Sequence, residues 1–311
     1  MKKWVTAFIS LILTVSILTI IACTKDTTQL TLKENDQAIL NSPGYMWEVK
    51  YNDNTVYLVG SIHIGDDTLY PLDPKYDKAF EEADYLAVEV DVTKETNNEH
   101  QKLDENKMYY MDGTTLKDNV SKQTYAKIED YLIQNNLDLN AFDIHKPWLI
   151  SYFTFSQVAL ESPYNAKKGI DWYFLQEALK NKTPIIELEP SELQNNLLAN
   201  FSNEMQERLL NITLDSYNSG TIYDDFDALV AAWKEGDEAA LLKMLDDMAG
   251  DTEYYKAMKT DRNIDMAEKI EDYLTSNNKE VYFVVVGALH YPGEKGIIKL
   301  LQDKGYTVVR K

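Results

Sequence analysis

Cysteine is nearly absent from this chain: Cys23 is the one cysteine among 311 residues. A single cysteine cannot form an internal disulfide, and it cannot supply the sets of thiolates that structural zinc sites use. The chemistry of the folded part must therefore come from histidines, carboxylates and other side chains.

Positive charge is also scarce. The chain has 31 Lys and Arg against 51 Asp and Glu, which gives a net charge of −20 and a pI near 4.6. Binding to phosphates needs clustered Lys and Arg, so we expect no nucleic-acid partner and no polybasic membrane-binding face. Only 12 Gly and 8 Pro accompany 44% hydrophobic residues, a composition typical of a globular protein with a substantial core.

Three common catalytic motifs are missing from the sequence. There is no His-Glu-x-x-His, no Gly-x-Ser-x-Gly and no phosphate-binding glycine loop. Their absence argues against the zincin, the α/β-hydrolase and the P-loop classes.

The N-terminal residues 1–22 have the pattern of a signal peptide, with Lys2 and Lys3 before an apolar stretch that ends at Ala22. The segment Ile20–Cys23 resembles the lipobox of bacterial lipoproteins, in which the cysteine carries acyl chains such as palmitate. We therefore expect a lipid on Cys23, a polar tether over 23–43 and a location on the extracytoplasmic face of the cell membrane. An uncleaved transmembrane anchor is the alternative. Lipidation leaves no free thiol, which excludes a cysteine nucleophile.

The remaining residues, 44–311, predict one α/β domain with a central, mainly parallel or mixed sheet flanked by helices. Short apolar runs predict the strands, and amphipathic stretches predict the helices between them. A mostly helical cap is expected over 191–276. The predicted strands are 44–49, 55–59, 85–90, 184–189, 281–286 and 306–309, and the predicted helices are 75–82, 121–135, 147–161, 169–181, 191–216, 226–233, 237–248 and 252–276.

One short pattern occurs twice. The apolar run before Gly60 leads into Gly60-Ser61-Ile62-His63, and the run before Gly287 leads into Gly287-Ala288-Leu289-His290. A glycine at a strand end permits a sharp turn, and ligands of open α/β folds bind at the carboxyl edge of the sheet. The two halves of the sheet are thus predicted to bring His63 and His290, two of the four histidines, together.

Acidic residues occupy the ends of two other predicted strands. Glu89 interrupts an apolar run, where a charge needs a cation, a hydrogen-bond donor or a metal. Glu187 and Glu189 share one face of their strand. Histidine and carboxylate ligands at a sheet edge suit a divalent metal such as zinc, manganese or iron, which lowers the pKa of a bound water to about 7.

The chain resembles the TraB/GumN family, which includes pheromone-shutdown proteins of conjugative plasmids and the animal Tiki proteases. The resemblance covers about residues 44–311. It rests on Gly60–His63, where Ser61 replaces the usual threonine, and on Val286–Gly293, followed by Gly296–Leu301 and Gly305–Val308. Glu89, Leu188-Glu189 and Arg262-Asn263 match between these motifs.

This resemblance implies a metal-dependent hydrolase, in particular a peptidase, with a Mn, Co or Zn ion. Arg262 is expected to stabilise an oxyanion or to pair with a site carboxylate, and Asn263 to orient a ligand. By analogy with the Tiki proteins, His63, Glu89 and His290 are expected to hold or serve the metal. We assign His63, His290 and Glu189 as the metal residues, and Glu89, Arg262 and Asn263 as the catalytic residues.

Two other functions remain open at this point. The protein is alternatively a binding module that sequesters a peptide or signal peptide without cutting it, or a lipoprotein that handles haem or metal ions. The expected partners are a peptide and, through the lipid anchor, the membrane. The sequence does not predict the oligomeric state.

Overall fold

The structure, a computed structural model, describes residues 44–94, 104–249 and 252–311. The predicted signal peptide, Cys23 and the tether over 23–43 lie outside these ranges. Across the described ranges, every helix is too short or too polar to cross a membrane.

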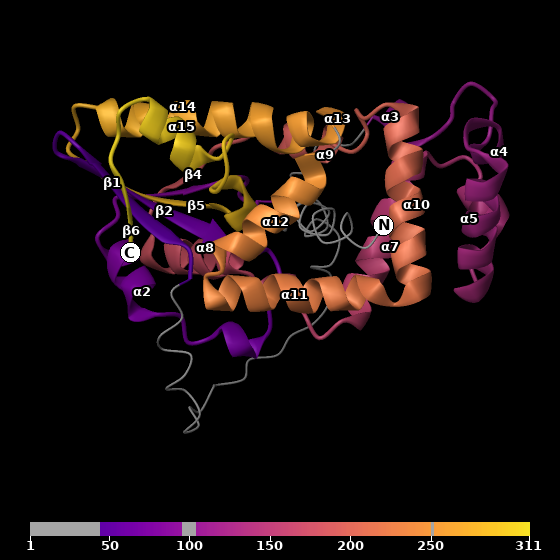
Figure 1. Cartoon of the computed structure of the whole chain (residues 1–311), viewed down its shortest axis with the longest axis horizontal. Helices are drawn as coiled ribbons and strands as arrows, with labels where there is room; N and C mark the ends of the chain where they lie inside the picture. Colours follow the sequence, from indigo (N-terminus) through magenta and orange to yellow (C-terminus); the bar gives the residue numbers. More distant parts are fainter. Residues whose placement is uncertain (1–43, 95–103, 250–251) are drawn as a thin grey trace.

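A mixed sheet of six strands forms the centre of the fold, in the order β4-β3-β5-β2-β1-β6 (Figure 1). Neighbouring strands from β4 to β2 are parallel, whereas β1 is antiparallel to both β2 and β6. This arrangement confirms the α/β class. The strands are β1 Met46–Tyr51, β2 Asn54–Ser61, β3 Tyr85–Val88, β4 Ile185–Glu187, β5 Val281–Gly287 and β6 Val308–Arg310.

Helices fill the connections between the strands. The N-terminal turn of α2 is capped by Asp73, whose side chain accepts the N–H of Lys75, and that of α5 by Ser121, as helix starts require. The α-helices are α2 Pro74–Glu81, α3 Glu105–Met108, α4 Leu116–Asn119, α5 Lys122–Gln134, α6 Leu139–Phe142, α7 Pro147–Glu161, α8 Ile170–Asn181, α9 Ser191–Asn196, α10 Asn203–Ser219, α11 Thr221–Glu235, α12 Glu238–Ala249, α13 Thr252–Tyr255, α14 Asp261–Thr275 and α15 Ile297–Asp303.

The single helix predicted over 191–216 is wrong. Helix α9 ends at Asn196, and α10 starts only at Asn203. Ser202 caps the new helix by accepting the N–H of Met205, while Glu253 accepts both the N–H and the hydroxyl of Ser202. The start is therefore fixed by a distant carboxylate that local periodicity does not reveal.

The helix predicted over 252–276 is also divided. A π-helical turn, Lys256–Thr260, separates α13 from α14 without a break in the chain direction. Helix α14 then lies along β2 and β1 as a sheet-flanking helix. The described residues between 191 and 276 are mostly helical, but α14 belongs to the sheet layers, and α10 packs instead on α7 and α5.

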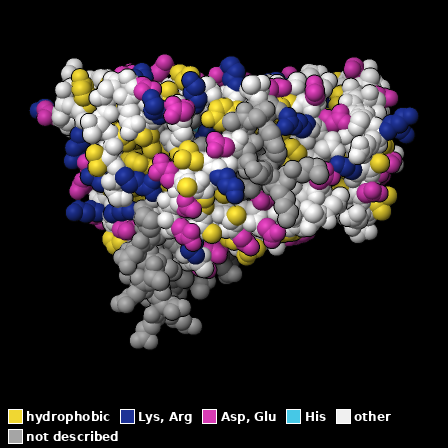
Figure 2. Space-filling view, in the orientation of Figure 1, with side chains coloured by type: hydrophobic (Ala, Val, Ile, Leu, Met, Phe, Trp, Pro, Cys, Tyr) yellow, Lys and Arg dark blue, Asp and Glu magenta, His cyan; other side chains and the backbone are white. Residues whose placement is uncertain are grey.

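A block of helices lies at the opposite end of the molecule from β6 (Figure 1). It has its own small core between α5, α7 and α10, separate from the main core around the sheet. On the face shown in Figure 2, acidic and basic side chains are interspersed. The sheet end, where β-strands meet helices α8, α11 and α14, is the part that positions the site.

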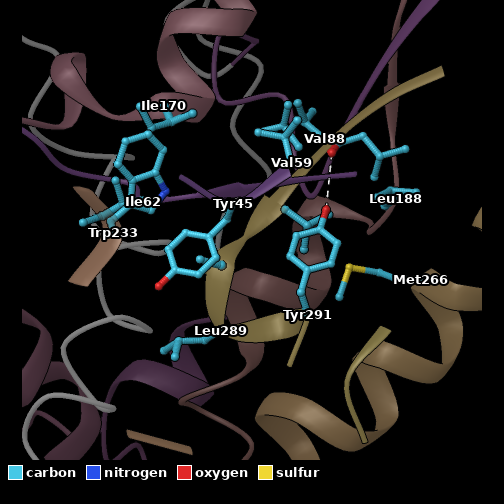
Figure 3. Close-up of a cluster of buried hydrophobic side chains, with 14 of the residues drawn as sticks. Tyr45, Val59, Ile62, Val88, Ile170, Leu188, Trp233, Met266, Leu289 and Tyr291 are labelled. Atoms are coloured by element: carbon cyan, nitrogen blue, oxygen red, sulfur yellow. Dashed lines mark hydrogen bonds between the residues drawn. The ribbon is translucent and has the colours of Figure 1, made fainter. Parts of the chain in front are cut away.

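The first Gly-x-x-His turn is packed tightly under helix α11. Trp233 donates its Nε1–H to the carbonyl of Gly60 at 2.8 Å, and Tyr45 donates to the carbonyl of Ala232 at 3.1 Å. A Cβ on Gly60 would lie 2.6 Å from the Cβ of Tyr45, so no larger residue fits there without movement. Figure 3 shows these aromatic side chains together with Tyr291 in one buried cluster.

Candidate functional site

The two Gly-x-x-His turns are neighbours in the sheet. Strands β2 and β5 pair in parallel with Ser61 opposite Gly287, so both strands end at the same edge. The expected juxtaposition of these turns is confirmed, and it follows from a crossover that places β5 between β2 and β3. His63 and His290 are both buried behind this edge.

The acidic residues continue the same edge. Strand β3 ends at Val88, before the predicted end at residue 90, so Glu89 follows the strand directly. The N–H of Glu189 donates to the carbonyl of Glu89 at 2.9 Å, just beyond β4. The carboxyl ends of β4, β3, β5 and β2 therefore bring four charged or titratable side chains into one row, the usual ligand position of an open α/β sheet.

Gly287 marks the point where three of these side chains converge. A Cβ on this glycine would lie 3.2 Å from Oε1 of Glu89, 3.4 Å from Nε2 of His63 and 3.5 Å from Cδ2 of His290. The N–H of Gly287 donates to Oε1 of Glu89 at 2.6 Å. The backbone at this turn thus fixes the carboxylate close to the point where the two imidazole rings approach Gly287.

The tautomer of His290 follows from its partner. Asn263 donates its Nδ2–H to the carbonyl of Lys295 at 2.6 Å, because a carbonyl only accepts. Its Oδ1 therefore faces Nδ1 of His290, 2.5 Å away, and that nitrogen must carry the hydrogen. Burial, with the charges of Arg262, Lys259 and His63, holds the pKa of His290 well below its usual value. The ring is neutral, and Nε2 keeps its lone pair.

His63 is oriented by a residue that was not predicted. Nδ1 of His63 lies 3.2 Å from Oδ1 of Asp171, in the first turn of α8. The same carboxylate oxygen accepts the hydroxyl of Ser61 at 2.8 Å, and Ser61 accepts the N–H of Asp171 in return. A Cβ on Gly169 would lie 2.6 Å from the carbonyl oxygen of His63, so glycine permits this approach of the helix. Nε2 of His63 then points toward Glu89, at 3.9 Å from Oε1.

The electrostatics of His63 oppose those of His290. Burial alone would lower the pKa of His63, but the carboxylates of Asp171 and Glu89 outweigh it and raise the pKa. The two imidazoles therefore differ in basicity although they occupy equivalent turns.

Replacing Asp171 with asparagine tests this orientation. The substitution keeps the shape of the side chain but removes the charge that holds Nδ1–H of His63. Partners of this kind typically contribute about 10- to 100-fold to metal affinity or activity. We therefore expect Asp171→Asn to lower the activity of the site by about that factor. Asp77→Asn is the matched control, since Asp77 bonds Tyr173 of the same helix but is no partner of His63. Equal losses in both variants would contradict the assignment.

Arg262 binds two carboxylates at once. Its Nε and Nη2 donate to Oε1 and Oε2 of Glu189 at 2.7 and 2.6 Å, and Nη2 also donates to Oε2 of Glu89 at 2.6 Å. Burial alone would lower the pKa of Arg262, but Glu189 and Glu89 outweigh it and raise the pKa. Of the two roles expected for Arg262, pairing with site carboxylates is the one that the structure shows.

Lys259 is the second residue that was not predicted. Its side chain is 3% exposed, and its Nζ has no hydrogen-bond partner within the described part of the chain. Burial, reinforced by Arg262 and opposed by Glu89, holds its pKa well below the usual value. No sequence signal distinguishes this lysine, which belongs to a polar stretch. Asp171 gave a weak signal, as an acid directly after Gly169-Ile170 at a helix start.

A pocket lies beside His63, between the two Gly-x-x-His turns and helices α11 and α12. Its lining is mainly apolar apart from His63 and a serine hydroxyl. The lining residues are Ser61, Ile62, His63, Leu229, Trp233, Leu241, Ala288 and Leu289.

The structure brings all six predicted site residues of the folded domain together, with Glu189 connected to the others through Arg262. Cys23 lies outside the described residues. Over residues 44–94, 104–249 and 252–311, no group of three or more His, Cys, Asp or Glu side chains is arranged to hold a metal ion. His145 lies elsewhere, among Phe142, Phe153 and Tyr109.

Comparison with known proteins identifies relatives over most of the folded domain. The chain is 24% identical over 249 residues to the uncharacterized protein YbaP of Escherichia coli strain K12. The aligned region covers 79% of this chain and 87% of YbaP. YbaP of Shigella flexneri matches to the same extent. No solved structure matches the chain. The model of the TraB/PrgY/gumN family matches residues 45–310, a span that contains both Gly-x-x-His turns and every carboxylate of the site. The chain therefore belongs to the TraB/PrgY/gumN family.

Proposed function

We propose that this protein is a metal-dependent hydrolase, and specifically a peptidase. The observation that supports this most directly is the convergence of His63, Glu89 and His290 around Gly287. Each imidazole is held through Nδ1, so that Nε2 remains on the side of the converging groups. Histidine ligands of metal sites are usually oriented in this way by a partner on the other ring nitrogen.

A divalent ion at this place would take its protein ligands mainly from nitrogen. Nε2 of His63 and Nε2 of His290 would hold it, with Glu89 beside them. Glu189, expected from the sequence as a third ligand, is bound through both oxygens to Arg262, so in this arrangement it supports the site through the arginine. A bound Mn, Co or Zn ion would supply Lewis acidity and lower the pKa of a bound water to about 7.

Side chains and backbone groups of the protein would carry out the proton transfers. Glu89 would accept a proton from the attacking water at Oε1, while Arg262 and the N–H of Gly287 fix the orientation of its carboxylate. The water oxygen would form a bond to the peptide carbonyl carbon as the C–N bond breaks, and the proton held by Glu89 would pass to the departing amine.

The expected lipid anchor would determine where the site acts. With acyl chains on Cys23, the site would act at the extracytoplasmic surface of the membrane, on peptides that are exposed there or pass through it.

Metal content and peptide cleavage test the proposed function together. We expect purified full-length protein to hold a divalent metal and to cleave members of a peptide library. Chelation, His63→Ala and His290→Ala should each lower cleavage by at least about 100-fold, because the nucleophile is no longer generated at neutral pH. Folding of each variant is checked by thermal unfolding.

The same experiment separates the competing functions. Peptides recovered intact by mass spectrometry after long incubation with metal-loaded protein would refute hydrolysis and favour sequestration. A Soret band on titration with haem would instead favour haem handling. Cleavage that resists chelation and survives His63→Ala would contradict the metal-dependent mechanism.

A further inference from the structure

Lys259 is the group of the site that the proposed mechanism leaves unused. Its side-chain amino group is buried and lacks any hydrogen-bond partner among the residues that the structure describes. A buried polar group without a partner is costly, and native proteins pair nearly all such groups. A lysine kept in this position therefore points to a partner that arrives from outside the chain.

The position of Lys259 in its helix supports a role in the site. The residue belongs to the π-helical turn Lys256–Thr260, directly before α14. Single π-helical turns occur frequently at functional sites. Arg262, which binds both site glutamates, follows three residues later.

The charge of Lys259 also acts on the residues of the site. It interacts electrostatically with Glu89 and Arg262 and contributes to the lowered pKa of His290. Arg262 is already engaged, since Nε and Nη2 donate to carboxylates and Nη1 approaches the carbonyl of Met258 at 3.5 Å. Among the described residues of this cluster, Lys259 is thus the basic side chain whose donor hydrogens have no acceptor.

We propose that Lys259 binds a carboxylate of the peptide ligand and so selects peptides that carry one next to the reacting bond. This inference rests on the proposed peptidase function. The carboxylate belongs either to the C-terminus of the peptide or to an acidic side chain. A singly charged group suits the site better than a phosphate dianion, because three carboxylates already lie in the cluster, those of Glu89, Asp171 and Glu189.

Binding of matched peptides to the full-length, metal-loaded protein tests the proposal. The probes are N-acetyl-trialanine, its C-terminal amide, and an amidated N-acetyl peptide with one internal glutamate, measured by calorimetry. We expect wild type to bind one of the two carboxylate-bearing probes at least tenfold more tightly than the neutral amide. The preferred probe shows whether the terminal or the side-chain carboxylate is recognised.

Three variants assign the effect to the lysine. Lys259→Met should erase the preference, so that the acid and the neutral amide bind with equal affinity, and its Tm should equal or exceed that of wild type because a buried polar group without a partner is removed. Lys259→Arg should retain part of the preference. Lys256→Met is the matched control from the same π-helical turn, because its ammonium pairs with Asp261 at the surface, and it should keep the full preference.

Equal binding of charged and neutral probes by wild type, or a preference that persists in Lys259→Met, would overturn the proposal. Absence of binding of all three probes would overturn it as well. Mass spectrometry of the recovered probes keeps this result separate from the proposed function. A Lys259-dependent preference without cleavage refutes only the hydrolase, and cleavage without a preference refutes only the carboxylate subsite.

Discussion

Replacing Arg262 with methionine is expected to lower the free energy of unfolding by about 3–5 kcal/mol. The guanidinium is buried between Glu89 and Glu189 and donates three hydrogen bonds to them. Methionine fills a similar volume but leaves two carboxylates buried without their cation, and breaking a buried ion pair in this way is strongly destabilising. Chemical denaturation of wild type and variant measures the difference.

The control is an ion pair at the surface. Lys279 pairs with Asp53 at 2.9 Å, with both side chains largely exposed, so Lys279→Met should change stability by less than about 1 kcal/mol. Adding Glu89→Gln and Glu189→Gln to Arg262→Met should restore part of the lost stability, because no unpaired charge then remains. A loss below about 1 kcal/mol for Arg262→Met alone would show that the glutamates do not depend on this arginine.

Glu89→Gln is expected to reduce kcat/KM for peptide cleavage by about 10²- to 10⁴-fold, the range typical of a lost general base. Glutamine keeps the shape of the side chain but cannot take the proton of the attacking water. Arg262 retains its paired contacts with Glu189, so the variant should still fold. The rate constants are compared at saturating metal.

Glu187→Gln provides the matched control. Glu187 also ends a strand of the same sheet, but it binds the N–H of Asp91 and the ammonium of Lys94, away from the histidines. Its replacement should leave kcat/KM within about threefold of wild type, as expected for a partly exposed ion pair. If Glu89→Gln has no larger effect than Glu187→Gln, Glu89 is not the base.

The parts of the fold with strong local signals were predictable from the sequence. The hairpin of β1 and β2, the runs that became β3 and β5, and helix α7 all carry a period or a turn signal within a few residues. The repeated Gly-x-x-His motif also predicted that His63 and His290 lie close together, because two neighbouring parallel strands end at the same edge of the sheet. The strand order itself needed the structure.

The features that were missed depend on contacts between distant segments. Ser202 starts α10 because Glu253 binds it across 51 positions, and Asp171 reaches His63 and Ser61 across more than 100 positions. Lys259 becomes unusual only when burial removes water from its ammonium. Charged residues of this kind look like ordinary surface residues until the tertiary structure surrounds them.

The antiparallel direction of β1 decides where the chain enters the folded domain. Met46 lies opposite Val59 near the end of β2, and the carbonyl of Tyr45 accepts the N–H of Gly60 at 2.8 Å. The first described residues therefore lie at the sheet edge that carries the histidines, and not at the opposite edge. If Cys23 is lipidated as proposed, the tether can span at most about 70 Å, from about 3.4 Å per residue. The sheet edge with the histidines would then be the part of the domain closest along the chain to the lipid anchor. Lengthening the tether would increase the distance from the bilayer at which this edge can act.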